Sequence, residues 1–168
     1  MSFYPWCEMK KIKGEMEIEN VQKKSQSQTG GEKPMILRKY MSLIGIGSAE
    51  VDLVLDKDVY RPGEAVHGCF YIKGGTIEQQ IKRIDCDLVM EDSSIPKEET
   101  VDSISILSSS QIESEKTVQF PFSFQLPESL SASTEQITYK FKTLLTFTEG
   151  LESQDSDHIK IISKRDQS

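Results

Sequence analysis

The chain has 168 residues, 36% of them hydrophobic, and a formal net charge of −7. This length accommodates one domain with a substantial core and excludes two domains of ordinary size. The acidic balance, without a basic stripe, argues against binding to nucleic acids or anionic membrane surfaces. The longest apolar stretch, 41–47, is too short to span a bilayer, and residues 1–14 lack the apolar region of a secretory signal. We therefore expect a cytoplasmic protein.

The first 34 residues differ in composition from the rest. Mixed charges are followed by a run rich in Ser, Gln and Gly at 25–31, which is typical of a flexible linker. We predict disorder over 1–34, with at most a short helix at 8–24. Two explanations stay open: a genuine flexible tail, or a translated upstream region with Met35 as the natural start. The second rests on the purine-rich codons that 31–33 require shortly before Met35.

A strand, a turn and a second strand are predicted in the next part of the chain. Apolar residues alternate with polar ones over 49–55 and again over 65–74, as half-buried strands require. Between them, 56–64 is charged, and Pro62 and Gly63 are suited to the two central positions of a turn.

Further short strands follow, separated by polar loops. The stretch 81–91 alternates with Cys86 on the inner face, whereas Cys69 falls on the outer face of the preceding strand. Two cysteines on opposite faces are poorly placed to form a disulfide with each other. A weaker strand is predicted at 100–107, with polar loops at 92–99 and 108–115.

The stretch 116–126 is the richest core segment, because Val118, three phenylalanines and Leu126 share one face. Pro121 lacks a backbone donor, so this strand is expected at an edge or to be bulged. Strands are also predicted at 137–147 and 158–162, with an acidic turn region at 149–157. Many short strands at this spacing predict an all-β sandwich.

Few residues suggest chemistry. His67 and His158 have no Cys or His partner at ligand spacing, and no G-x-S-x-G motif is present. Two acidic groups could supply oxygen ligands to calcium: Asp52, Asp56 and Asp58 in one, Asp155 and Asp157 in the other. Without an Asp-x-Asp-x-Asp-Gly loop, we favour solvated acidic loops instead. We therefore predict no catalytic, cofactor-binding or metal-binding residue.

Two stretches together carry a family resemblance. SAEVDLVLDKDVYRPGEAVHGCFYIKGG at 48–75 and FPFSFQLPESL at 120–130 resemble the sporulation-control protein M family of endospore-forming bacteria. The Gly-rich lead-in at 43–52 is similar to that of the family and supports a start at Met35. Arrestins show similar marks, a Tyr-x-Pro-Gly-Glu corner and a Phe-x-Phe-x-Leu-Pro strand end. The resemblance extends from Met35 to Ile162.

The resemblance implies an arrestin-like (immunoglobulin-like) antiparallel β-sandwich of the N-terminal type. The expected boundaries are a domain at 35–162 and a polar tail at 163–168. The family also implies a regulator that binds other proteins, without catalysis or a cofactor. The motif residues that it marks are expected to be structural: Tyr60, Pro62, Gly63, Phe120, Phe122, Phe124 and Pro127.

Full members of the family resemble arrestins in having two tandem sandwiches, so we expect this chain to be a half-arrestin. A face that the second sandwich normally covers would then be exposed and would favour self-association. The alternative is a β-sandwich that binds carbohydrate or envelope components, for which Tyr71 and Tyr40 give slight support. An enzyme is a third possibility, for which no residue constellation is present.

Overall fold

A computed structural model describes residues 47–163. The predictions of disorder at 1–34 and of a short helix at 8–24 lie outside the described residues, as does the predicted polar tail at 163–168 apart from residue 163. Within 47–163 the fold is entirely β, which confirms the predicted class. The strands are β1 (Glu50–Leu55), β2 (Val59–Tyr60), β3 (Ala65–Lys73), β4 (Gln79–Asp92), β5 (Glu98–Leu107), β6 (Gln111–Ile112), β7 (Thr117–Gln125), β8 (Ile137–Phe147) and β9 (Glu152–Ile161).

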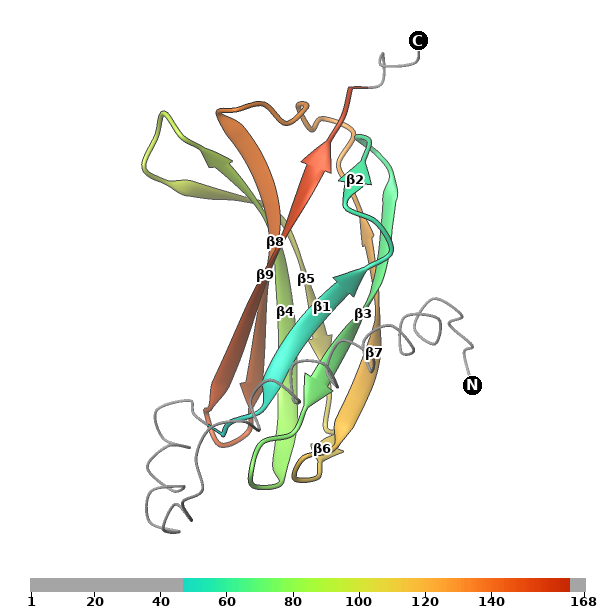
Figure 1. Ribbon diagram of the computed structural model, residues 1–168, viewed down its shortest axis with the longest axis vertical. Helices are drawn as coiled ribbons and strands as arrows, with labels where there is room; N and C mark the ends of the chain where they lie inside the picture. The colour runs from blue at the N-terminus through green and yellow to red at the C-terminus, as the bar shows by residue number, and fades with distance from the viewer. Residues whose placement is uncertain (1–46, 164–168) are drawn as a thin grey trace, which may run out of the picture.

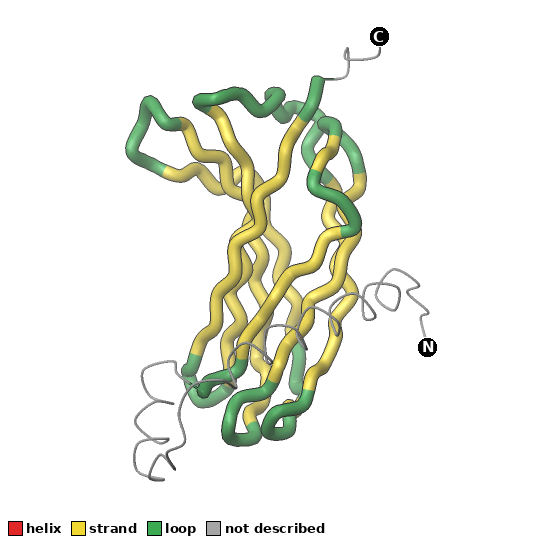
Figure 2. The backbone as a smooth tube through the Cα atoms, viewed as in Figure 1, coloured by secondary structure: helices red, strands yellow, loops and turns green. Residues whose placement is uncertain are grey.

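Two sheets pack face to face, and the connecting loops gather at the two ends of the sandwich (Figures 1 and 2). The smaller sheet has the order β1-β3-β7 and is antiparallel. The larger sheet has the order β2-β9-β8-β4-β5, and β6 pairs with the start of β4. Only β2 and β9 are parallel among these pairs. The connection between β4 and β5 projects away from the sandwich (Figure 1).

The predicted alternation explains the smaller sheet. On β3, the inner positions Val66, Phe70 and Ile72 are fully buried. The β7 strand lies at the sheet edge, as Pro121 predicted, and pairs along its whole length with β3. Because one face of each strand meets the opposite sheet, apolar residues at every second position suffice to close the core.

A group of phenylalanines joins the two sheets at the centre of the core. The ring of Phe122 lies edge-on to Phe70 at 5.2 Å and to Phe141 at 5.3 Å between centroids. Phe124 also contacts Phe141 edge-on, at 5.1 Å. Edge-to-face pairs of this kind each stabilise a fold by about 0.5–1.5 kcal/mol beyond the burial of their area. The phenylalanine-rich strand is therefore central to the core, as predicted.

The structure corrects two expectations. The acidic segment predicted as a turn at 149–157 is mostly strand, because β9 begins at Glu152. The polar loop at 108–115 contains the short strand β6, whose Ile112 is fully buried. Cys69 is adjacent to the inner residue Phe70 and so lies on the other face of β3, as predicted, although its side chain is only 2% exposed. Cys86 is buried and free, as predicted for the inner face.

Residues 47–163 contain no helix that is long and apolar enough to cross a membrane.

Candidate functional site

The corner between β2 and β3 is a tight turn over Arg61–Glu64. The Glu64 amide donates to the Arg61 carbonyl at 3.1 Å, which closes the turn. Gly63 has a φ of 78°, in the region that side chains disfavour, and Pro62 precedes it. This is the pattern of a type II turn, which needs glycine at its third position. The predicted turn chemistry at Pro62 and Gly63 is thus confirmed.

Tyr60 anchors the corner from inside. Its side chain is 1% exposed, and its hydroxyl donates to Asp56 Oδ1 at 2.6 Å and to the Lys57 carbonyl at 2.7 Å. Burial, followed by hydrogen bonding to Asp56, raises the pKa of the Tyr60 hydroxyl far above its ordinary value. The hydroxyl therefore stays protonated and fixes the loop that precedes β2.

The corner docks directly on the end of β7. The Gly63 amide donates to the Pro127 carbonyl at 3.2 Å, and the Leu126 amide donates to the Glu64 carbonyl at 3.0 Å. The side-chain amide of Gln125 donates to the Gly63 carbonyl at 2.6 Å. The two stretches that carry the family resemblance therefore meet in space and hold each other, which is consistent with structural roles for both.

A second feature is the seam where β9 of the larger sheet runs beside β1 of the smaller sheet. Ser153 and Asp155 lie on the inner side of β9 and take the place of a neighbouring strand. Ser153 Oγ accepts a hydrogen bond from the Val51 amide at 3.2 Å, and Asp155 Oδ2 accepts one from the Leu53 amide at 2.8 Å. These polar side chains satisfy backbone donors of β1 that have no ladder partner there.

Three carboxylates gather at this seam. Asp52 on β1 and Asp155 and Asp157 on β9 have carboxylate oxygens within 4.8 Å of one another. Burial and the neighbouring charge of Asp155 raise the pKa of Asp157 to about 8. Like charges this close disfavour simultaneous ionisation, so the group retains a proton near neutral pH. Asp157 also borders an open hollow of about 310 Å³, together with Leu55, Lys57, Asp58 and His158.

The sequence grouped these carboxylates differently. Asp52, Asp56 and Asp58 were expected to form one acidic loop cluster and the two β9 aspartates another. In the structure, Asp56 instead accepts a hydrogen bond from the Tyr60 hydroxyl, and Asp52 lies beside the two aspartates of β9. Oxygen ligands of this kind suit calcium, but the proton held by Asp157 opposes cation binding at neutral pH. The prediction of no metal-binding residue stays a prediction.

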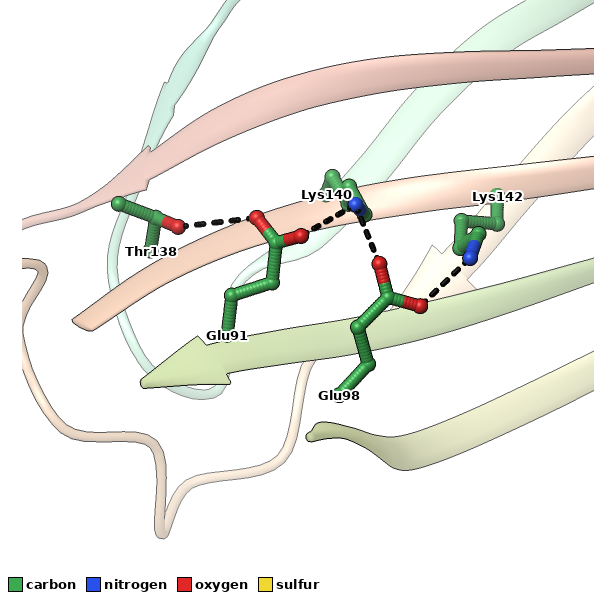
Figure 3. Close-up of polar contacts among 5 residues, drawn as sticks. All are labelled: Glu91, Glu98, Thr138, Lys140 and Lys142. Carbon is green, nitrogen blue, oxygen red and sulfur yellow. Dashed lines mark hydrogen bonds and ion pairs between the residues drawn. The ribbon is translucent and has the colours of Figure 1, made fainter. Parts of the chain in front are cut away.

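A third feature is a network of ion pairs on the outer face of the larger sheet (Figure 3). Lys140 Nζ lies 2.5 Å from Glu91 and 2.6 Å from Glu98, and Lys142 Nζ lies 2.5 Å from Glu98. Thr138 also donates to Glu91, at 3.3 Å. The pKa of Glu98 is lowered to about 2, first by its hydrogen bond from Lys140. The network ties β4, β5 and β8 together where a bulge interrupts the β4–β5 ladder at Leu88/Val89.

The remaining candidates do not come together. His67 lies on β3 and His158 on β9, in different sheets. Tyr71, proposed as a contact for carbohydrate, is half-buried on β3, and Tyr40 lies outside the described residues. Sequence reasoning missed both the seam and the ion-pair network. A signal for the seam was present, because Ser153, Asp155 and Asp157 continue the two-residue spacing of the apolar residues that follow.

Comparison with known proteins identifies relatives of this chain. Residues 37–168 match the family model described as SpoOM protein. The chain is 35% identical over 128 residues to the sporulation-control protein spo0M of Bacillus subtilis (strain 168), covering 73% of this chain and 50% of that protein. The crystal structure of Spo0M from Bacillus subtilis matches with a TM-score of 0.64 at 34% identity, over 69% of this chain and 50% of that one. The chain thus spans about half the length of the relative it matches.

Proposed function

We propose, from the premise that this chain belongs to the SpoOM protein family, that it is a sporulation regulator which acts by binding other proteins. The observation that carries the proposal is the match over 37–168 to a family whose curated relative is named for sporulation control. Regulation by binding, without catalysis, is the mode of action that we assign to it.

The structural features support a binding role. The residues of both motifs are engaged in holding the corner against the end of β7. Tyr60 is a protonated, buried anchor, and Ser153 and Asp155 of the seam satisfy backbone donors of β1. Functional groups of the described part are thus used for architecture, which leaves surfaces and strand edges for recognition.

A complementation experiment tests the proposed function. The chain is expressed in a Bacillus subtilis strain that lacks its own spo0M gene, and heat-resistant spores are counted. We expect the spore count to change relative to the empty vector. The matched control is the Phe122→Ala variant, which removes the central ring of the core and is expected to lose the effect. A count that the wild-type chain leaves unchanged at equal expression would refute a role in sporulation.

A further inference from the structure

We propose that the outer edge of β5 is a docking edge for an extended, basic segment of a protein partner, which adds a strand to the larger sheet. This inference rests on the proposed protein-binding function and specifies the surface and the chemistry of the partner. In such binding, backbone hydrogen bonds provide affinity and alternate side chains provide specificity.

The backbone of β5 is open on one side. β5 is the last strand of the larger sheet, and all of its ten residues except Val101, which is left out at the bulge, pair on the other side with β4. The Ser108 amide donates to the Lys82 carbonyl of that neighbour at 3.2 Å. Because the donor direction alternates along an antiparallel strand, the amides of Ser103, Ser105 and Leu107 point away from β4. Leu107 is 79% exposed.

Other edges in residues 47–163 are closed or short. The amides of Val51 and Leu53 on β1 are occupied by side chains of β9. The strand β7 contains Pro121, which cannot donate to an added strand. The strand β2 has only two residues. β5 is therefore the long edge within 47–163 that neither a capping side chain of another strand nor a proline interrupts.

Side chains on the outer face hold β5 against its neighbours in the sheet. Ser103 Oγ donates to Asp87 Oδ1 at 2.6 Å, and Ser105 Oγ donates to Asp85 Oδ1 at 2.5 Å. At its start, Glu98 is fixed by the ion pairs to β8 (Figure 3). An edge that is already ordered loses little conformational freedom when a strand is added.

One residue, Asp102, caps a backbone donor at this edge. Asp102 lies opposite the buried Leu88, next to the bulge, and its carboxylate accepts the outward-pointing Ser103 amide at 2.8 Å. Charged residues and bulges are devices by which sheet edges avoid indiscriminate pairing. An incoming lysine or arginine can pair with the Asp102 carboxylate and release the Ser103 amide to the added strand.

The charge of β5 selects the partner. The strand carries Glu98, Glu99 and Asp102 and no basic residue. Glu98 is neutralised by two lysines, whereas Glu99 and Asp102 form no ion pair with the described residues. A second copy of this chain would bring the same negative charge to the edge. A segment with alternating basic and apolar residues compensates this charge. Its basic side chains that pair with Asp102 lie on the face that Asp102 shares with Ile104 and Ile106, so their aliphatic stems can contact these two residues.

A peptide titration tests the proposal on the isotopically labelled full chain. The probe is a synthetic peptide of about ten residues that alternates lysine and valine, and the matched control peptide alternates glutamate and valine. We expect the lysine peptide to protect the amides of Ser103, Ser105 and Leu107 from hydrogen exchange. Ser105→Pro, which removes an outward donor, should weaken binding about tenfold or more, whereas Ser105→Ala should bind within about twofold of wild type.

A charge reversal gives an independent measurement, even where Ser105→Pro fails to fold. Asp102→Lys should shift the preference from the lysine peptide to the glutamate peptide. Absence of binding, protection at another strand, equal binding of both peptides, or an unaltered preference in Asp102→Lys would each overturn the proposal. If the chain forms a dimer that dissociates in the Ser105→Pro variant, the edge binds a second copy of this chain. The assignment of a basic partner segment to the edge would then be wrong. Because these measurements use peptides, their result is separate from the spore count that tests the proposed function.

Discussion

Asp157 is expected to make the stability of this protein fall as the pH rises towards 8. Burial and the charge of Asp155 raise the pKa of its carboxyl from 3.8 to about 8. In the unfolded chain the carboxyl regains its ordinary pKa. Between about pH 4 and pH 8 the folded protein therefore binds one proton more than the unfolded chain, so the free energy of unfolding falls as the pH rises through this window.

The size of the effect follows from the proton difference. One full proton corresponds to a slope of about 1.4 kcal/mol per pH unit. Because Asp157 is only partly buried, solvent screening reduces the pKa shift and shortens the pH window over which this slope holds, so averaged over about pH 5–7 we expect about 0.7 kcal/mol per pH unit. Glu64 and Glu98 have lowered pKa values, so their stabilising effect is lost only as the pH falls below this range. The Asp157 slope is thus separable from theirs.

The substitution Asp157→Asn removes the titrating group and keeps its shape. It should flatten the slope over about pH 5–7 and raise the free energy of unfolding at about pH 8 by about 2–3 kcal/mol. Urea unfolding followed by circular dichroism at several pH values measures both quantities. Asp58→Asn is the matched control, because it makes the same charge change beside the same hollow. An unaltered slope in Asp157→Asn would refute the reasoning, as would equal flattening in both variants.

Three other predictions concern the corner, the core and the seam. Gly63→Ala places a Cβ 3.0 Å from the Glu128 side chain at a φ of 78°, and should lower stability by about 1–3 kcal/mol. Gly150→Ala, at a φ of 84° with open space around it, should lower stability by only about 1 kcal/mol. Equal losses of stability for the two variants in urea unfolding would contradict a role for the contact with Glu128. Phe122→Ala should cost about 3–5 kcal/mol by the same measurement, and a loss below about 1 kcal/mol would mean that the ring is dispensable. Calcium at about 1 mM should leave the melting temperature at neutral pH unchanged, because Asp157 holds a proton; a clear rise would demonstrate a cation site.

The sequence predicted the strands whose inner faces are apolar. The two stretches around the corner became β1 and β3 with nearly the expected bounds, and the phenylalanine-rich stretch became the edge strand β7. In each of these strands, every second residue faces the opposite sheet, so burial and sequence share the same period. Pro121 also placed β7 at an edge, because a missing donor is tolerated there.

The short strands could not be predicted because distant pairing creates them. The two residues of β2 are strand only because they lie parallel to Lys160 and Ile161 of β9, about a hundred positions away in the sequence. Similarly, β6 exists because it meets Gln79 and Gln80 at the start of β4. Segments of two residues have no periodicity, so their sequence carries no strand signal.

The error at β9 has a different cause, and it bears on function. The inner positions Ser153 and Asp155 face the backbone edge of β1 instead of a layer of side chains, so polar acceptors suit them better than apolar residues. The polar residues were assigned to a turn because burial was equated with hydrophobicity. The hydrogen bonds that Ser153 and Asp155 accept explain why this strand is polar. They also occupy the edge of β1, so that it is closed to added strands. Within residues 47–163, β5 has no such cap from another strand, and that difference directs the search for a partner to the outer edge of β5.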